Sequence, residues 1–179
     1  MSCKLKNNKI EIGKPSRPIF SDHYVKGDLI GKGTFGSVFR AWRIDPEQHD
    51  TFAVKVIDLD ETCKEELESQ VNLEIEILKE LRHDNIIQMY DHFVDGSSYS
   101  LVTEFLEGGD LYTRIALKTT YSEKDTRDTC KILFEAIAYC HERNIAHLDL
   151  KPKNLLLVVS LLKCSVTSCR AYMFTPLFP

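Results

Sequence analysis

Hydrophobic and polar residues alternate along several stretches of the first 104 residues, and this two-residue period predicts β-strands. Residues 24–43 hold two such runs on either side of a glycine-rich turn, which indicates a hairpin. Further runs over 51–57, 88–94 and 98–104 predict three more strands, the last two joined by a turn at Asp95–Ser97. The pattern therefore predicts five strands.

A period of three to four residues replaces the alternation over 60–82 and predicts a helix with one apolar face. Glu74 follows Val71 by three residues and precedes Leu78 by four, so it shares their face and should point inward. Glu76 lies further round the helix and should face solvent.

The stretch 121–143 has the same period and predicts a second long helix. Ser122 should cap its start, with Asp125 three residues later as a weak capping box. A shorter helix is predicted from Asp110 to Ile115. The residues that recur along the long helix, and that we interpret as core and not as a cofactor site, are Cys130, Leu133, Phe134, Ile137 and His141.

The segment Ala146–Leu157 reads A-H-L-D-L-K-P-K-N-L-L-L and brings reactive side chains together. Asp149 on a rigid loop could accept a proton from an attacking hydroxyl, and Lys151 could neutralise charge on a phosphoryl group in transfer. Asn154 could turn back and ligate a hard cation through its carbonyl oxygen. A chance loop containing these residues is the alternative, so the decision depends on the rest of the chain.

Gly31, Gly33 and Gly36 form the pattern G-x-G-x-x-G, which dinucleotide-binding folds also contain. In those folds the third glycine opens a helix, whereas here the β-rich run Ser37–Trp42 follows it. A glycine turn between two strands can lie over a ligand, because its backbone N–H groups can approach phosphate closely.

Lys55 lies among apolar residues in the strand predicted over 51–57. A buried lysine costs several kcal/mol unless an anion pairs with it. A phosphate group or a glutamate of the first helix could supply that charge, with Glu74 favoured over Glu76 by its inward position. The alternative is an edge-strand lysine that points to water.

In their order and spacing, these motifs resemble those of the protein kinase family, serine/threonine type, and the run 121–157 resembles the calcium/calmodulin-dependent kinase group. The resemblance implies an α+β fold. Its N-terminal lobe would be complete, with a five-stranded antiparallel sheet and one long helix, and only the first helices and the catalytic loop of the helical C-terminal lobe would follow. The implied parts are a flexible leader (1–23), the N-terminal lobe (24–104), the hinge and partial C-terminal lobe (105–157) and a non-kinase tail (158–179).

The resemblance also implies an enzyme that uses ATP and Mg²⁺. Asp149 would orient the substrate hydroxyl, Lys151 would steady the transferred phosphate, and Asn154 would hold the metal. The residues that the resemblance implies around ATP are Ile30, Gly31, Lys32, Gly33, Thr34, Phe35, Gly36, Ser37, Val38, Ala53, Lys55, Glu74, Thr103, Glu104, Leu106, Asp110 and Leu156.

Three departures from the family pattern change this expectation. Leu148 replaces the usual arginine before the catalytic acid, so control through a phosphorylated activation loop should be absent. Lys153 replaces a common glutamate, which weakens any preference for basic residues in the substrate. No Asp or Glu follows Asp149, so the metal-holding Asp-Phe-Gly motif is missing. With Asn154 as the remaining metal ligand, we predict that the chain as written is truncated and transfers phosphate very slowly or not at all.

The sequence leaves two functions open. In the first, the chain is a truncated record of an ATP-dependent serine/threonine kinase, and its tail derives from non-coding or frame-shifted sequence. In the second, it is a short isoform with a spliced tail that binds nucleotide and acts as a catalytically dead scaffold or decoy. A transcript that encodes Asp-Phe-Gly soon after Leu157 would favour the first.

Composition limits the other function classes. A net charge of −4 argues against a broad nucleic-acid surface, and no apolar run reaches the about 20 residues of a membrane-spanning helix. Six cysteines without a C-x-x-C pair indicate reduced thiols in a cytoplasmic protein. The expected partner is a protein with a serine or threonine acceptor, and calmodulin would bind only a longer form of the chain.

Overall fold

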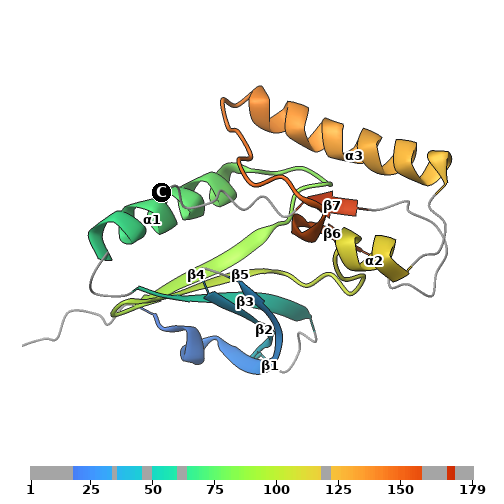
Figure 1. Ribbon diagram of the computed structural model, residues 1–179. Coiled ribbons are helices and arrows are strands. Elements are labelled where there is room, and N and C mark those ends of the chain that lie inside the picture. Colours follow the sequence, from blue (N-terminus) through green and yellow to red (C-terminus); the bar gives the residue numbers. More distant parts are fainter. Residues whose placement is uncertain are drawn as a thin grey trace, which may run out of the picture.

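The computed structural model describes residues 18–33, 36–45, 50–59, 64–117, 122–158 and 169–171. The predictions for Thr34, Phe35, the leader up to residue 17 and most of the tail lie outside these ranges. The described elements form two groups, one built on a sheet and one mainly helical (Figure 1).

The first group is a five-stranded antiparallel sheet, which confirms the five strands predicted from the pattern and the sheet that the resemblance implied. A short 3-10 helix, Phe20–Asp22, precedes it. The strands are β1 (Tyr24–Gly33), β2 (Gly36–Arg43), β3 (Thr51–Asp58), β4 (Met89–Asp95) and β5 (Ser98–Glu104), in the spatial order β1-β2-β3-β5-β4. Strand β3 is therefore central and pairs with β2 on one side and β5 on the other.

Helix α1 (Lys64–Glu80) lies along one face of this sheet (Figure 1). Val71 and Leu78 on its inner side pack with residues of β3 and β5 in one buried cluster. The prediction for the two glutamates is confirmed, because Glu74 is buried and Glu76 is exposed. The helical period was therefore sufficient to choose between them.

The opposite face of the sheet carries a second cluster that contains Tyr24, Phe52 and Phe93. The Tyr24 hydroxyl donates a hydrogen bond to Asp91, and Arg43 Nε donates one to the Tyr24 oxygen at 3.2 Å. Because these three polar residues lie on β1, β2 and β4, their network joins the two ends of the sheet.

The second group contains α2 (Leu111–Leu117), α3 (Glu123–His141), the 3-10 turn η2 (Pro152–Asn154) and the antiparallel pair β6 (Leu155–Leu157) and β7 (Cys169–Ala171). The predicted cap of α3 is confirmed, since Ser122 Oγ accepts a hydrogen bond from the Asp125 amide at 3.1 Å. Ser122 and Asp125 therefore satisfy amide groups at the start of α3 that lack partners within the helix.

The core prediction for α3 was one residue out of register. The buried residues of the helix are Thr129, Ala136 and Cys140, and the predicted Leu133 is half-buried on the same side. Phe134 is 63% exposed. Each residue turns a helix by about 100°, so the line through Phe134 lies beside the buried one and looks similar in sequence.

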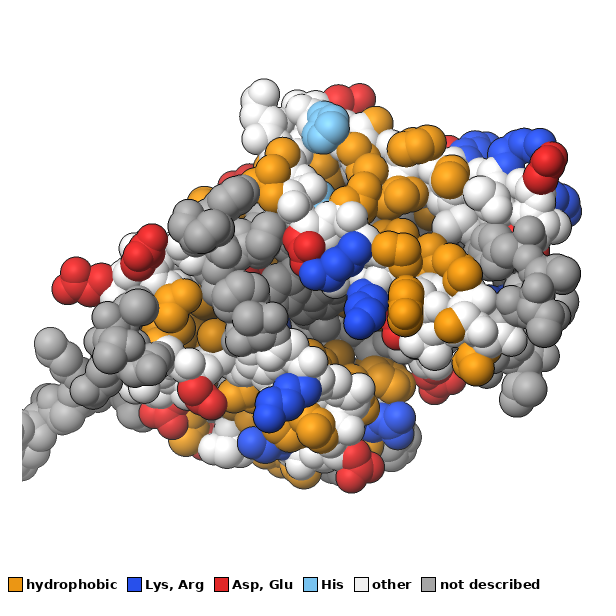
Figure 2. Space-filling view, viewed as in Figure 1, with side chains coloured by type: hydrophobic (Ala, Val, Ile, Leu, Met, Phe, Trp, Pro, Cys, Tyr) orange, Lys and Arg blue, Asp and Glu red, His pale blue; other side chains and the backbone are white. Residues whose placement is uncertain are grey.

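Hydrophobic side chains gather on the surface of the second group (Figure 2). The exposed large ones there include Tyr112, Ile115 and Leu117 of α2 and Phe134 of α3.

Two of the cysteines, Cys130 and Cys140, lie in α3, and both are free thiols. Among the described helices, none is both long and apolar enough to span a bilayer.

Candidate active site

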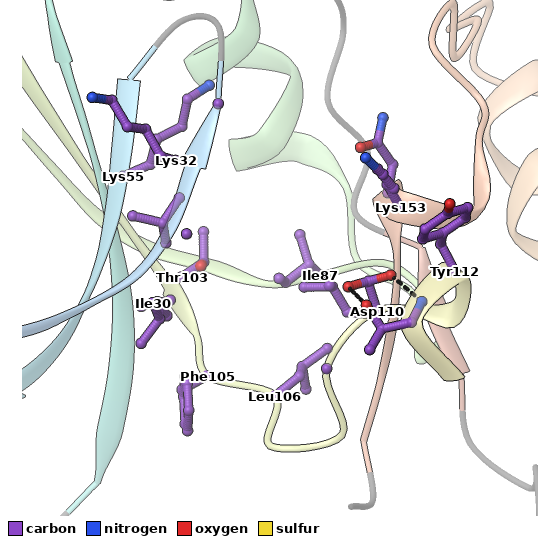
Figure 3. A pocket seen from close by; sticks show the side chains of 18 of the residues that line it. Ile30, Lys32, Lys55, Ile87, Thr103, Phe105, Leu106, Asp110, Tyr112 and Lys153 are labelled. Atoms are coloured by element: carbon purple, nitrogen blue, oxygen red, sulfur yellow. Dashed lines mark hydrogen bonds between the residues drawn. The ribbon is translucent and has the colours of Figure 1, made fainter. Parts of the chain in front are cut away.

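A cleft of about 830 Å³ opens between the sheet group and the helical group (Figure 3). The β1–β2 hairpin, β3 and β5 form one wall, and the start of α2 and the segment that includes η2 and β6 form the other. Its lining residues are Ile30, Gly31, Lys32, Gly33, Gly36, Val38, Ala53, Lys55, Ile87, Thr103, Glu104, Phe105, Leu106, Glu107, Gly109, Asp110, Tyr112, Thr113, Asp149, Lys151, Lys153, Asn154 and Leu156.

Apolar side chains from both walls line part of this cleft. Ile30, Val38 and Ala53 come from the sheet, and Leu106 and Leu156 come from the connecting segment and β6. A slot with apolar walls and a few polar groups suits a planar aromatic ring.

Gly36 sets how closely the hairpin packs on β3. It adopts a φ of 154°, and a Cβ on it would lie 2.1 Å from the carbonyl oxygen of Val56. Only glycine fits this position. At Gly31 and Gly33 a Cβ would meet nothing closer than 3.8 Å, so steric exclusion does not require glycine at either position.

Lys55 and Glu74 form a buried ion pair. Lys55 Nζ lies 3.7 Å from a Glu74 carboxylate oxygen, and the two side chains are 5% and 1% exposed. The central place of β3 excludes the alternative of an edge-strand lysine that points to water. Burial lowers the pKa of Lys55 and raises the pKa of Glu74, and the attraction within the pair opposes both shifts.

The residues predicted to form a catalytic loop meet around Asp149. Lys151 Nζ lies 2.5 Å from the Asp149 carboxylate, and Asn154 Nδ2 donates to the carboxylate at 2.9 Å and to the Asp149 carbonyl at 2.8 Å. The Asp149 amide donates to His147 Nδ1 at 3.2 Å. Lys151, followed by Asn154, holds the pKa of the Asp149 carboxyl below its usual value, so this group is a carboxylate at neutral pH.

The donor set around this loop is poor in metal ligands. Asp149 supplies one carboxylate, already paired with Lys151, and the carbonyl oxygen of Asn154 is the other hard donor. Within the described residues there is no cluster of three His, Cys, Asp or Glu side chains that could hold a metal ion. Mg²⁺ gives up its water reluctantly and is held chiefly by carboxylates and phosphates, so these residues do not fit a protein-held Mg²⁺ site.

Main-chain hydrogen bonds fix the floor of the cleft. The Gly108 amide donates to the Leu157 carbonyl, and the Leu157 amide donates to the Gly109 carbonyl, both at 2.9 Å. A Cβ on Gly108 would lie 2.3 Å from the Leu157 oxygen, so glycine is required for this approach. Asp110 caps α2 through the Thr113 amide at 2.7 Å, which agrees with the helix-cap interpretation.

Most residues that the resemblance assigned to ATP and catalysis line this one cleft. Ser37 and Glu74 do not, since Ser37 lies in the hairpin strand beside the cleft and Glu74 stands behind Lys55. Seven lining residues were not predicted to line a cleft. They are Ile87, Phe105, Glu107, Gly109, Tyr112, Thr113 and Lys153. No period or motif marks them, because the packing of the two groups brings them together.

Comparison with known proteins gives a consistent result. The protein kinase domain family matches residues 24–165. A probable myosin light chain kinase of Dictyostelium discoideum is 38% identical over 142 residues, which is 79% of this chain and 29% of that protein. Calcium/calmodulin-dependent protein kinase type 1 of Macrobrachium nipponense is 34% identical over 84% of this chain and 43% of its own length. Aurora kinase B of Mus musculus is 35% identical over 79% and 40%.

A solved structure is similar as well. The crystal structure of Rad53 1–466 in complex with AMP-PNP superposes with a TM-score of 0.72 at 28% identity, over 87% of this chain and 38% of that one. The chain spans less than half the length of each of these proteins. Relatives from different kinase groups are about equally similar, so the calcium/calmodulin-dependent group remains a prediction.

Proposed function

The chain belongs to the protein kinase family, and we propose that its cleft binds ATP and that its catalytic loop is of the type that acts on serine or threonine hydroxyls. One observation carries the proposal. A single cleft has Lys55 on one wall and Asp149 on the opposite wall. Glu74 pairs with Lys55, and Lys151 and Asn154 contact Asp149. This arrangement suits a nucleotide whose phosphates lie between them.

ATP fits the residues present. The adenine ring would rest in the apolar slot between Ala53 and Leu156, beside the backbone of the segment 104–106. The glycine hairpin can approach phosphate because no side chain at Gly31 or Gly33 intervenes. Lys55 would contribute positive charge to the phosphates. The N-terminal lobe (24–104) and the partial C-terminal lobe (105–157) would thus each supply one wall.

In phosphoryl transfer, the hydroxyl oxygen of the acceptor bonds to the terminal phosphorus as the bond to ADP breaks, and the hydroxyl proton passes to a base. Asp149 is that base in our proposal, since its lowered pKa keeps it ionised. Lys151 would neutralise charge on the phosphate in transfer. No step is assigned to Mg²⁺, because the donors present do not fit it.

For this reason we propose that the chain transfers phosphate very slowly or not at all, because transfer depends chiefly on the charge that metal ions place on the phosphates. The lack of a metal-ligand cluster among the described residues favours a second candidate: a nucleotide-binding scaffold or decoy without transfer. We also propose a protein partner with a serine or threonine acceptor and a cytoplasmic setting, which the free thiols of Cys130 and Cys140 support.

The test is to purify the chain and to measure its binding of a fluorescent ATP analogue, beside Lys55→Ala and a control, Lys79→Ala on the exposed side of α1. Binding is expected in the parent chain and in Lys79→Ala, and it should weaken about tenfold or more in Lys55→Ala. A folded parent chain that binds no ATP would overturn the nucleotide proposal.

Transfer is tested separately with radiolabelled ATP and generic protein acceptors, beside Asp149→Asn. The expected transfer is at the level of the Asp149→Asn variant. Fast transfer that Asp149→Asn abolishes would overturn the proposal of low activity and leave the nucleotide site intact.

A further inference from the structure

The carboxylates that line the cleft are mostly engaged with the protein itself. Glu104 accepts a hydrogen bond from the Gln88 amide at 2.8 Å, and Asp110 accepts from Thr113 through both of its oxygens. Asp149 is paired with Lys151. Of the cleft carboxylates, this leaves Glu107, an exposed residue of the connecting segment. Of these four carboxylates, Asp149 has its charge balanced by a lysine, whereas Glu104 and Asp110 are oriented by hydrogen bonds from neutral amide and hydroxyl groups.

Lysines supply the positive charge of the same cleft. Lys32 and Lys55 reach in from the strands, and Lys153 rises from the opposite wall, at the end of the cleft away from Phe105 and Leu106 (Figure 3). Lys153 Nζ lies 5.1 Å from the centre of the Tyr112 ring.

Lys32 and Lys153 differ from the other cleft lysines in their pairing. Within the part of the chain that the structure describes, neither has a carboxylate within ion-pair distance, whereas Lys55 and Lys151 each have one. Both side chains are exposed at the cleft. Their charge is therefore available to a polyanion.

We propose that this cleft takes ATP in its metal-free form, with lysines, chiefly Lys32 and Lys153, in the role of the metal ion. The inference rests on the proposed nucleotide site and deepens it. Free ATP carries more negative charge than its magnesium complex, so a site with unpaired ammonium groups and engaged carboxylates favours the free form. A magnesium ion on the phosphates would instead compete with Lys153 and Lys32 for the same oxygens.

The experiment is a calorimetric titration of the purified chain with ATP and with adenosine, each in EDTA and in excess Mg²⁺. Adenosine has no phosphate, so its affinity should be the same in both solutions. Its binding measures the contribution of the apolar slot alone. ATP should bind at least about threefold more tightly in EDTA than in Mg²⁺, and added Mg²⁺ should release bound ATP.

Lysine variants identify the groups responsible. Lys153→Gln and Lys32→Gln should each weaken ATP binding in EDTA by about threefold and leave adenosine binding unchanged. Lys124→Gln on α3, an exposed lysine outside the cleft, is the matched control and should change neither.

The outcomes separate the two proposals. If neither adenosine nor ATP binds to the folded chain, the nucleotide site itself is wrong. If both bind and Mg²⁺ tightens ATP binding, the nucleotide site stands and the metal-free inference is overturned. If Mg²⁺ has no effect and the lysine variants bind ATP like the parent chain, the inference is overturned as well.

Discussion

The ammonium group of Lys55 lies 3.7 Å from the carboxylate of Glu74, with both side chains almost fully buried. This pair joins the central strand of the sheet to the helix that covers it. The desolvation of two buried charges offsets most of their attraction, so the pair contributes little net stability. Its effect is to hold a charged lysine at the inner wall of the cleft.

Removal of one partner should therefore be costly. We expect Glu74→Gln to lower the free energy of unfolding by about 3 kcal/mol, because it leaves Lys55 buried without its counter-charge. The pKa of Lys55 is already lowered by burial and would fall further. Burial also raises the pKa of Glu74, so the parent chain itself protonates Glu74 as the pH falls and then resembles the variant. The loss in Glu74→Gln should therefore be largest above that pKa and shrink toward acidic pH.

Urea unfolding at several pH values measures this effect. Glu76→Gln is the matched control, since Glu76 lies on the exposed side of the same helix and pairs with Lys79 at the surface. Its change should stay within about 0.5 kcal/mol. Equal losses in the two variants would contradict the proposed importance of the buried charge.

Replacement of both partners should have the opposite result. In Lys55→Met combined with Glu74→Leu, no charge remains buried, so the free energy of unfolding should be unchanged or higher. ATP binding should be lost in the same variant. Thermal unfolding and nucleotide titration together test this, and a double variant that still binds ATP normally would show that the pair does not serve the cleft.

Gly36 and Gly33 offer a steric test within one motif. Gly36→Ala should cost about 2–3 kcal/mol, because its backbone is left-handed and its Cβ would meet the Val56 carbonyl. Gly33→Ala meets no contact closer than 3.8 Å and should cost less than about 1 kcal/mol. Chemical denaturation of both variants is the measurement, and similar costs would mean that the hairpin moves to relieve the contact.

The Tyr24 hydroxyl should lose its proton at a higher pH than an ordinary tyrosine. Burial, followed by its hydrogen bond to Asp91, raises the pKa of Tyr24 to about 12. Because the folded value exceeds that of free tyrosine, about 10, the stability from the neutral phenol is complete below pH about 10 and is lost as the pH rises through about 12. Tyrosinate absorbance should show a late step that disappears in Tyr24→Phe and persists in Tyr90→Phe, where the residue is exposed.

The exposed apolar side chains of the helical group should limit solubility. Phe134→Ser and Leu117→Ser remove side chains that are 63% and 65% exposed. They should raise the concentration at which the chain aggregates and change the free energy of unfolding by less than about 0.5 kcal/mol. Light scattering measures the first quantity, and Leu133→Ser on the inner side of α3 should instead destabilise the fold.

Local patterns in the sequence predicted the strands, the two long helices and the inward position of Glu74, because each depends on the geometry of one element. The core side of α3 was harder. Thr129 is buried although it is polar, because its hydroxyl donates to the Asp125 carbonyl at 2.8 Å. A hydrophobic pattern cannot identify a buried polar residue such as Thr129. The prediction therefore chose the more apolar line of residues through Phe134 as the core side of α3.

Features that depend on the order of strands or on the approach of the two groups were not predictable from local pattern. The network of Tyr24, Arg43 and Asp91 joins strands that are far apart in sequence. The same holds for Lys153 and Tyr112, which meet only because η2 lies against α2. The motif residues were found because chemistry constrains their type, whereas these neighbours are constrained by packing alone.

The reciprocal hydrogen bonds between Gly108, Gly109 and Leu157 make the chain from Gly108 onward part of the helical body. On the other side, the guanidinium of Arg40 on β2 lies 4.7 Å from the Phe105 ring centre. After β5, any rotation of one body against the other must therefore be taken up within Phe105–Glu107, whereas between α1 and β4 Leu81 and Ile86 are buried in the core of the helical body and move with it. Because this pivot is short, a rotation would separate the two walls of the cleft least beside the connecting segment and most at the end where the lysines lie. A small change in angle would regulate access to the phosphates and leave the aromatic slot almost unchanged.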